Sequence, residues 1–378
     1  MQGAYKAFAA GAVDSAQRLA TRALILSKSG PQPYDILWRV AQKKGDEAGQ
    51  LSNLRTAIDK LAGDTNNIPV RANFVYTLGR IQQEMAEKRP DKAAKAATMR
   101  EAIKAYMDLL KEYPTSDEAP FALQSIAMGG IAIGDTASAV AVVELLKSAP
   151  ARFGDGTLAQ AGVLATRLSR SADAAFLFGE AAKQNPYSRD FQYNLAAMLY
   201  ESKKIQEMLP VVRKLVALDP SNPDNILLFA YYYKTLSDVP EARVKAIQAD
   251  SAKTFAKADL AGKKAVRDSL AFYRAAQKVW VDSVAVYGEL ADKMPHRVAY
   301  TEFERGKEKT VLKGNVENHG KAARTFTIEF EFLGKDGAVV GKKAAVVENV
   351  AAGGTGDFTV ELPIGGVLGV RYAPLPLK

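Results

Sequence analysis

Apolar and polar positions follow the period of an α-helix over most of the chain. In ADAAFLFGEAAKQNP, residues 172–186, Ala174, Phe178 and Ala181 lie four and three residues apart and share one helix face. Pro186 follows where such a helix must already have ended. The small, large, small order predicts a helix that packs closely on a neighbour, with Phe178 filling the space between the two alanines.

The same pattern returns after 34 residues, which indicates an internal repeat. The shifted second-helix positions are Met208, Val212, Leu215 and Pro220, and a further shift reaches Ala242. A compact residue of a preceding helix recurs as Gly162, Ala196 and Ala230. A fixed period of this length with two helices per repeat is typical of a helical solenoid.

This spacing resembles the tetratricopeptide repeat (TPR) family. In that family the second helix carries an alanine, a large apolar residue, another alanine and a closing proline, as at Ala174, Phe178, Ala181 and Pro186. The match is good across residues 155–250 and partial elsewhere, for example in EAIKAYMDLLKEYP, residues 101–114. The resemblance implies an all-α TPR-like solenoid over residues 1–294.

Both ends of the helical region depart from the repeat. Gly11, Ala16 and Ala23 look like the loop and second helix of a repeat whose first helix is short, so we expect the sequence to start inside a repeat, with an export signal upstream. Residues 251–294 lose the 34-residue phase but keep apolar residues three and four apart, which predicts capping helices. Trp280 is predicted to be a core residue there.

After residue 294 the period changes from that of a helix to that of a strand. In RTFTIEFEFL, residues 324–333, Phe326, Ile328, Phe330 and Phe332 alternate with polar residues, which predicts a half-buried strand. Asp336-Gly337 predicts a tight turn. Residues 295–378 are therefore expected to form six or seven strands of a small all-β antiparallel sandwich.

This second region resembles the FxLYD domain, a small immunoglobulin-like module of bacterial envelope proteins. The matching stretches are GNVEN (314–318), EFLGKDG (331–337), ENVAAGGTGDF (348–358) and VRYA (370–373). FLGKDG replaces the tyrosine-aspartate that gives the family its name. The resemblance implies an immunoglobulin-like, extracytoplasmic module without known catalysis, and with the TPR-like region it implies a multidomain protein.

Composition excludes several classes of function but says little about the cellular location of the protein. The chain has 378 residues and no cysteine, which excludes thiolate catalysis, zinc–cysteine sites and disulfides. No apolar run is long enough for a membrane-spanning helix. The net charge is +9, with basic residues gathered in residues 88–104 and 243–267. Helical spacing favours solvated faces over an anionic partner, and the lack of interleaved aromatic residues argues against nucleic acid.

Motifs for catalysis, metals or cofactors are nearly absent. The two histidines, His296 and His319, lack a second histidine at metal-ligand spacing. The Glu329 and Glu331 pair fits a wet sheet face better than acid–base chemistry. Neither GAVVGKK (337–343) nor GGTGDF (353–358) has the context of a phosphate-binding loop. We therefore predict no catalytic residue, no metal and no cofactor.

The remaining candidate site is a surface. In TPR arrays the first helices line a groove, and the matching positions here are Gln160, Arg167, Tyr193, Asn194, Tyr200, Tyr231 and Lys234. Tyrosines suit protein contacts because each offers a broad apolar area and one polar tip. The alternative is that they pack between repeats, although the run Tyr231-Tyr232-Tyr233 cannot be buried in one seam.

Three functional hypotheses follow. The leading one is a non-enzymatic protein-interaction scaffold of a bacterial envelope, in the periplasm, serving as an accessory or assembly subunit of a larger complex such as one embedded in a membrane. The second is a periplasmic protein that binds a small ligand or glycan in a cleft between the two regions, near residues 296–303. The third is an enzyme with no readable motif. The sequence leaves a cytoplasmic location open.

Overall fold

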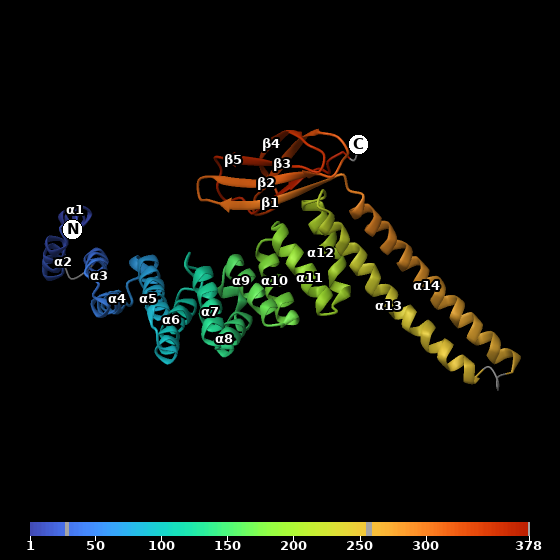
Figure 1. The fold of residues 1–378 in the computed structure, drawn as a ribbon, viewed down its shortest axis with the longest axis horizontal. Coiled ribbons are helices and arrows are strands. Elements are labelled where there is room, and N and C mark those ends of the chain that lie inside the picture. The colour runs from blue at the N-terminus through green and yellow to red at the C-terminus, as the bar shows by residue number, and fades with distance from the viewer. Residues whose placement is uncertain (27–29, 255–258, 377–378) are drawn as a thin grey trace. The chain divides into compact units, whose positions relative to one another are not determined.

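The computed structural model describes residues 1–26, 30–254 and 259–376. Residues 255–258 belong to the expected capping helices and to the second basic stretch, and they lie outside the described residues, as do residues 27–29 and 377–378. The chain divides into two compact units, Met1–Ser169 and Arg170–Lys378. Each unit is described by itself (Figure 1).

The first unit consists of helices that pack in chain order. They are α1 (Gln2–Ala9), α2 (Val13–Leu26), α3 (Gln32–Lys43), α4 (Glu47–Lys60), α5 (Ile68–Lys88), α6 (Lys92–Glu112), α7 (Ala119–Ile133), α8 (Thr136–Ser148) and α9 (Asp155–Arg167), with short 3₁₀ turns at Thr65–Asn67 and Pro150–Arg152. Each helix contacts the next, and α1 also contacts α3, as α7 contacts α9. Contacts between alternate helices are those expected of stacked helical hairpins.

Local sequence explains where these helices begin and how closely they approach. The carboxylates of Asp46, Asp91 and Asp135 cap α4, α6 and α8 by accepting hydrogen bonds from backbone amides three residues on. A Cβ at Gly79 of α5 would lie 2.7 Å from the Tyr106 ring of α6. Gly79 therefore lets Tyr106, which is 1% exposed, pack against the α5 backbone.

The second unit begins with five helices: α10 (Ser171–Gln184), α11 (Arg189–Glu201), α12 (Ile205–Leu218), α13 (Pro223–Thr254) and α14 (Leu260–Asp292). Ala174, Phe178 and Ala181 of α10 are buried, and the helix ends two residues before Pro186, as the sequence predicts. Consecutive helices pack together, and α11 also contacts α13. This region is therefore a TPR-like array of helical hairpins.

The third repeat of the predicted array is not formed. The pattern places a turn between Ala230 and Ala242, but α13 runs through both as one helix. The turn between α11 and α12 contains Lys203 at φ 60°, whereas the residue 34 positions later, Ser237, stays helical and donates its hydroxyl to the Lys234 carbonyl. No glycine is present to stop the helix there, and Pro240 is accommodated within it.

The helical residues of 251–294 form one long hairpin with the preceding chain rather than separate caps. Helices α13 and α14 run side by side along their length (Figure 1). Trp280 of α14 is half-buried rather than a full core residue, and its ring stacks on Tyr233 of α13 with centroids 5.8 Å apart. The hairpin seam holds these aromatic rings.

The strands of the described chain form two antiparallel three-stranded sheets. They are β1 (His296–Arg305), β2 (Thr310–Asn318), β3 (Arg324–Leu333), β4 (Val339–Val350), β5 (Thr355–Leu362) and β6 (Gly369–Tyr372), in the orders β1-β2-β5 and β4-β3-β6. Phe326, Ile328, Phe330 and Phe332 are at most 2% exposed, so the alternation predicted for β3 is confirmed. The expected turn occurs at Gly337, with φ 74°.

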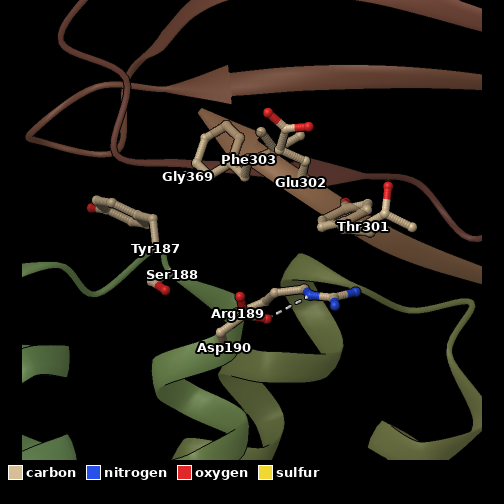
Figure 2. Close-up of a pocket in the computed structure, with 10 residues that line it drawn as sticks. Tyr187, Ser188, Arg189, Asp190, Thr301, Glu302, Phe303 and Gly369 are labelled. Atoms are coloured by element: carbon tan, nitrogen blue, oxygen red, sulfur yellow. Dashed lines mark hydrogen bonds and ion pairs between the residues drawn. The ribbon is translucent and has the colours of Figure 1, made fainter. Parts of the chain in front are cut away.

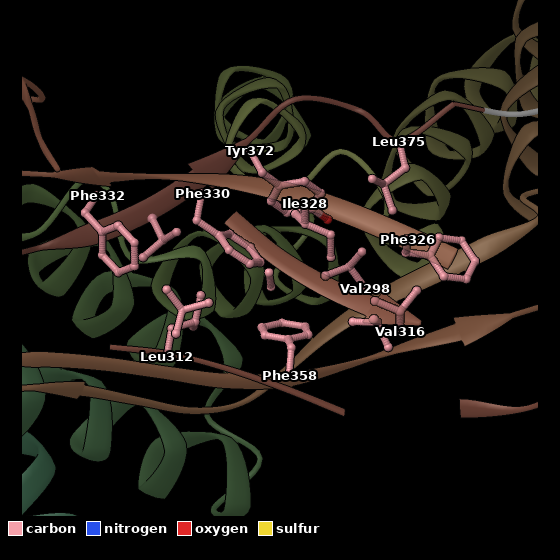
Figure 3. Packing of buried hydrophobic residues seen from close by; sticks show 14 of the residues in the cluster. Val298, Leu312, Val316, Phe326, Ile328, Phe330, Phe332, Phe358, Tyr372 and Leu375 are labelled. Carbon is pink, nitrogen blue, oxygen red and sulfur yellow. The ribbon is translucent and has the colours of Figure 1, made fainter. Parts of the chain in front are cut away.

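Side chains from both sheets meet in one apolar core. Val298, Leu312, Val316 and Phe358 come from the first sheet, and Phe326, Ile328, Phe330 and Tyr372 come from the second (Figure 3). Phe330 lies at this contact, with its ring centroid 5.2 Å from that of Phe358 and 5.7 Å from that of Tyr372. Each buried aromatic ring contributes about 2–3 kcal/mol of apolar burial, which holds the two layers together.

Candidate partner-binding site

Two turns of the helical array hold the sheets in place. Asn185 and Asp219 stand immediately before Pro186 and Pro220, at equivalent positions 34 residues apart. The Asn185 side-chain amide donates to the Leu368 carbonyl at 2.9 Å. Asp219 accepts a hydrogen bond from the Tyr372 hydroxyl at 2.5 Å. Equivalent ends of successive repeats therefore contact the β-region.

Asp219 is the centre of a buried polar network. Its side chain is fully buried, and it also accepts hydrogen bonds from Arg189 at 3.0 Å and from the amides of Asn222 and Asn225 at 3.2 and 3.0 Å. Burial, reinforced by the Asp219 charge, raises the pKa of Tyr372 well above its usual value. Because each of these donors is held in place by the fold, their hydrogen bonds offset the free-energy cost of removing the Asp219 carboxylate from water.

Backbone hydrogen bonds reinforce this contact. The Val298 amide donates to the Ser221 carbonyl at 2.9 Å, and the Ser221 amide donates to the Tyr372 hydroxyl oxygen at 3.2 Å. The Ser221 hydroxyl accepts from the Leu375 amide at 3.0 Å. The turn between α12 and α13 is thus joined to β1 by a main-chain hydrogen bond, and to β6 and the segment after it by bonds that each use one side chain.

A small cavity opens beside the network. Its walls are Tyr187, Ser188, Arg189 and Asp190 from the start of α11 and its preceding turn, Tyr300, Thr301, Glu302 and Phe303 from β1, and Gly369 and Val370 from β6 (Figure 2). Its volume is about 90 Å³. Pockets for organic ligands usually hold roughly 300–1,000 Å³. The cavity near residues 296–303 is therefore too small for a sugar or muropeptide in this conformation.

The predicted groove tyrosines lie on α11 and α13, and we call Tyr193, Tyr200 and Tyr231 the tyrosine surface. Tyr193 and Tyr231 are 39% and 46% exposed, and Tyr200 is half-buried. The rings of Tyr200 and Tyr231 have centroids 5.4 Å apart. Burial, followed by the nearby Asp224 charge, raises the pKa of Tyr193 above its usual value.

The other groove residues take different places. Asn194 is half-buried on α11, and Lys234 is exposed on α13 in an ion pair with Asp238. Gln160 and Arg167 are exposed on α9, in the first unit. The three consecutive tyrosines separate: Tyr231 is exposed, Tyr232 is 9% exposed, and Tyr233 stacks on Tyr287 of α14 at 5.4 Å.

A groove continues from the tyrosine surface along the outer half of α13. Tyr200, Glu201, Lys203 and Ile205 line one side, and Thr235, Asp238, Val239, Ala242, Arg243 and Ala246 line the other. Its volume is about 890 Å³. The groove exists because α13 extends beyond the helices that pack on its base. Ala242 and Ala246 of α13 are among its lining residues.

The histidines and Glu331, which the sequence analysis considered for metal binding or acid–base chemistry, contact other parts of the fold. His296 is 1% exposed and packs edge-on against Phe326, and burial lowers its pKa to about 4, with Arg324 and His319 adding to the effect. His319 contacts the Met294 carbonyl and Glu317. Glu331 pairs with Lys342 and Arg371 across the exposed sheet face.

The described part of the chain offers neither a metal-binding cluster nor a membrane-spanning helix. Within these ranges no group of three or more His, Asp or Glu side chains is placed to hold a metal ion. Among the same residues, no helix combines the length and apolar character needed to cross a membrane.

Sequence reasoning missed the contact between the repeats and the sheets. The available signal was the 34-residue recurrence of Asn185 and Asp219 before a proline. This recurrence indicated a common turn. It did not indicate the contact with Tyr372, because no sequence pattern links a turn residue to a partner more than 150 positions away. Tyr372 also has the pattern of an ordinary inward-facing strand residue.

No protein-family model matches the chain, and no curated protein matches it. Among solved structures, the TPR2AB domain of yeast Sti1 in its pHSP90 complex is 17% identical, with 73% of this chain and 96% of that chain covered and a TM-score of 0.28. A tetratricopeptide repeat protein from Parabacteroides merdae is 19% identical, with 70% and 93% covered and a TM-score of 0.30. PilW, a type IV pilus biogenesis factor, is 12% identical, with 57% and 90% covered and a TM-score of 0.29.

Similarity at this level carries no argument about function, so the fold is assigned from the helix pairs themselves. Within each of the two units consecutive helices pack together, and alternate helices meet at α1–α3, α7–α9 and α11–α13. The small residues of α10 are buried where the repeat pattern requires them. The chain is a TPR-like helical repeat protein with a C-terminal region of two antiparallel sheets.

Proposed function

We propose that the chain is a non-enzymatic interaction protein that binds another protein through the tyrosine surface. The observation that carries this proposal is the exposure of Tyr193 and Tyr231, 39% and 46%, on helices whose other faces are buried in a packed core. Aromatic side chains fixed on a rigid support contribute much binding free energy because little ordering is needed. The adjoining groove along α13 extends the available surface.

We further propose that the protein acts in a bacterial envelope, in the periplasm, as an accessory or assembly subunit of a larger complex. The support is the similarity of residues 305–375 to the FxLYD module, carried by GNVEN and ENVAAGGTGDF. The two-sheet arrangement around Phe330 and Phe358 is compatible with an immunoglobulin-like sandwich. Release of the native protein by osmotic shock tests the location, and retention with cytoplasmic markers would contradict it.

The small-ligand alternative has less support. The cavity beside Arg189 and Tyr300 is about 90 Å³, and Glu302 and Asp190 add negative charge to its walls. Such a volume suits a few water molecules rather than a glycan. Interaction with a protein therefore remains the function that the exposed surfaces support best.

The test is co-purification with matched variants. Native protein from gently solubilised membranes of its source is expected to carry a partner in fixed ratio. The triple variant Tyr193→Ala, Tyr200→Ala and Tyr231→Ala should lose that partner, because hot-spot tyrosines each contribute about 2 kcal/mol. Phe176→Ala, an exposed aromatic change on α10, is the control. If the triple variant melts like wild type and keeps its partner in the same ratio, the tyrosine surface is not the binding site.

A further inference from the structure

A row of basic side chains follows the face by which α14 packs on α13. Tyr273, Gln277 and Trp280 belong to that face: all three are half-buried, and the Trp280 ring stacks on Tyr233 of α13 with centroids 5.8 Å apart. A basic residue comes directly after each of Val266, Tyr273 and Gln277, and a further one lies one helical turn earlier. We call these four residues the basic row: Lys263, Arg267, Arg274 and Lys278.

The basic row occupies one side of the helix. Its steps of four, seven and four residues are close to whole turns, so the side chains point the same way. At roughly 1.5 Å per residue, the row is about 22 Å long. Lys263 is half-buried and the other three members are exposed. No acidic residue interrupts the row, and beyond it the same side of the helix continues through Val281, Ala285 and Gly288 to Asp292.

Most members of the basic row have no ion-pair partner. Lys278 pairs with Asp282 at 2.8 Å. Among the residues that the structure describes, the other three members form no ion pair. On α13 the arrangement differs, because Lys234 and Lys245 each pair with an acid four residues away. The positive charge of the row is therefore compensated only at Lys278.

The other charged side chains of the two helices lie elsewhere. Asp259 caps α14 by accepting a hydrogen bond from a first-turn amide at 2.8 Å. Lys264 and Asp268 lie four residues apart on the side of α14 away from α13. Arg243 of α13 lines the groove beside the tyrosine surface, and Asp250 two turns later shares its side. The remaining charged residues gather at the C-terminal end of α14: Asp282, Glu289, Asp292 and, just after the helix, Lys293.

Leu260 adds an apolar side chain to the same side of α14. It lies about five helical turns before Lys278, so the two side chains point the same way. Leu260 is 89% exposed, more than any other large apolar residue that the structure describes. One exposed leucine is ordinary on a soluble protein. A leucine at the end of a row of uncompensated cations is the combination found on helices that lie at the surface of an anionic membrane.

Two observations favour a lipid surface over another anionic partner. An anionic bilayer presents negative headgroups at every spacing, and beneath them lies an apolar layer that can take up Leu260. Nucleic acid and acidic protein helices present negative charge without such a layer. Single-stranded nucleic acid also stacks on aromatic rings set among basic residues, whereas this side of α14 carries Ala271 between Arg267 and Arg274.

We propose that the basic row of α14, with Leu260 at its end, docks on an anionic lipid surface. The cations meet the headgroups, and Leu260 enters the apolar layer below them. This contact goes beyond the proposed binding of a protein partner and uses different residues from the tyrosine surface. Variants of the two surfaces therefore separate the failure of one proposal from the failure of the other.

The test measures flotation of the full chain with vesicles. Vesicles of phosphatidylcholine alone are compared with vesicles that also contain about 30% phosphatidylglycerol, in about 0.1 M salt. The chain should bind the second kind at least about tenfold more strongly, and more weakly as the salt concentration rises. Each basic residue held at an anionic surface strengthens binding roughly fivefold. The variant Lys263→Gln, Arg267→Gln, Arg274→Gln and Lys278→Gln should therefore bind at least about thirtyfold more weakly.

Matched variants separate the basic row from the overall charge of the chain. Lys92→Gln, Lys95→Gln, Arg100→Gln and Lys104→Gln remove the same charge from α6, and this variant should bind within about twofold of wild type because distant charges are screened. Exchange of lysine for arginine, and of arginine for lysine, at the four positions of the row keeps the charge and should keep the binding. Leu260→Ser should weaken binding at least about threefold.

Several outcomes would overturn the proposal. They are equal binding to the two kinds of vesicle, undiminished binding of the glutamine variant of the row, and an equal loss in the α6 variant. Binding to a glutamate-rich helical peptide or to duplex DNA that is tighter than binding to the vesicles, and that the same four changes remove, would identify a different partner and overturn it as well. The triple variant of Tyr193, Tyr200 and Tyr231 should keep full vesicle binding, so its effect on the protein partner tests the proposed function separately.

Discussion

The Asp219 carboxylate and the Tyr372 hydroxyl are joined by a hydrogen bond of 2.5 Å in a fully buried site. This contact links the turn after α12 to the last strand, β6. Arg189 at the start of α11 binds the same carboxylate at 3.0 Å. One acidic side chain thus ties two helices to a sheet, and its loss would remove an acceptor that donors from three elements share.

Removing either member of this pair should lower the free energy of unfolding. Asp219→Asn removes the charge that Arg189 and Tyr372 bind, and we expect a loss of about 3–5 kcal/mol, as for other broken buried ion pairs. Tyr372→Phe removes one donor and should cost about 1–3 kcal/mol. Urea denaturation of both variants and of the double variant measures the coupling between the two residues.

The matched control is Asp224→Asn. Asp224 pairs with Arg297 at 2.7 Å, but the two side chains are 41% and 35% exposed, so the change should cost less than about 1 kcal/mol. Strict additivity of the Asp219 and Tyr372 effects would show that the hydrogen bond does not contribute as the geometry indicates.

Close packing between the turn before α11 and the sheet depends on Gly369. A Cβ at this position would lie 2.1 Å from the Tyr187 carbonyl oxygen, and backbone atoms cannot move aside as a side chain can. Gly369→Ala should therefore destabilise the protein by about 1–3 kcal/mol in thermal or urea unfolding. In contrast, a Cβ at Gly288 on α14 would meet no described atom within 4 Å, and Gly288→Ala should stabilise by about 0.5–1 kcal/mol. Equal effects of the two changes would contradict this steric explanation.

The repeat core offers a prediction with a control in the same helix. Phe178 is 2% exposed on α10, and Phe178→Ala should lower the free energy of unfolding by about 3–5 kcal/mol because a cavity remains. Phe176, two residues earlier, is 39% exposed, and Phe176→Ala should cost much less. Chemical denaturation of both variants measures the difference, and similar losses would show that Phe178 does not fill the repeat core.

Local pattern was sufficient to predict the packed face of α10 and the alternation of β3. The spacing of Ala174, Phe178 and Ala181 reflects burial on one face, and that requirement is visible within a few turns of sequence. The alternation from Phe326 to Phe332 has the same local origin. Such patterns report what faces the core, and the core of each hairpin or sheet is formed by nearby residues.

A local sequence pattern does not show where the repeat array ends or how it contacts the sheets, because both depend on contacts between residues that are distant in the sequence. The positions of Ala230 and Ala242 are compatible both with two separate helices and with one continuous helix. Two helices would require Ser237 to adopt the left-handed backbone conformation that Lys203 adopts. The extensive packing of α14 on α13, with Trp280 and Tyr287 stacked on Tyr233, favours the continuous helix. Similarly, the role of Asp219 appears only when Tyr372 and Arg189 are brought to it by the fold.

The buried His296 predicts a specific acid sensitivity. Its folded-state pKa of about 4 lies below the ordinary value of 6.5, because burial, Arg324 and His319 all disfavour the charged ring. The unfolded chain therefore binds the proton first, so stability is fully present above about pH 6.5 and falls as pH drops toward 4. The shift corresponds to a loss of about 3 kcal/mol across that window, with no further loss from this group below it.

Urea unfolding of wild type and of His296→Gln, measured between about pH 7.5 and 3.5, tests this assignment. The range spans roughly the pKa of an ordinary histidine and the lower pKa of a buried one. The difference between the two stability curves should change between about pH 6.5 and 4 and stay level outside that window, since the carboxylates common to both proteins cancel. His319→Gln, which alters a side chain bound to Glu317 at the surface, should keep most of the wild-type slope. Parallel curves for wild type and His296→Gln would show that His296 is not the group responsible.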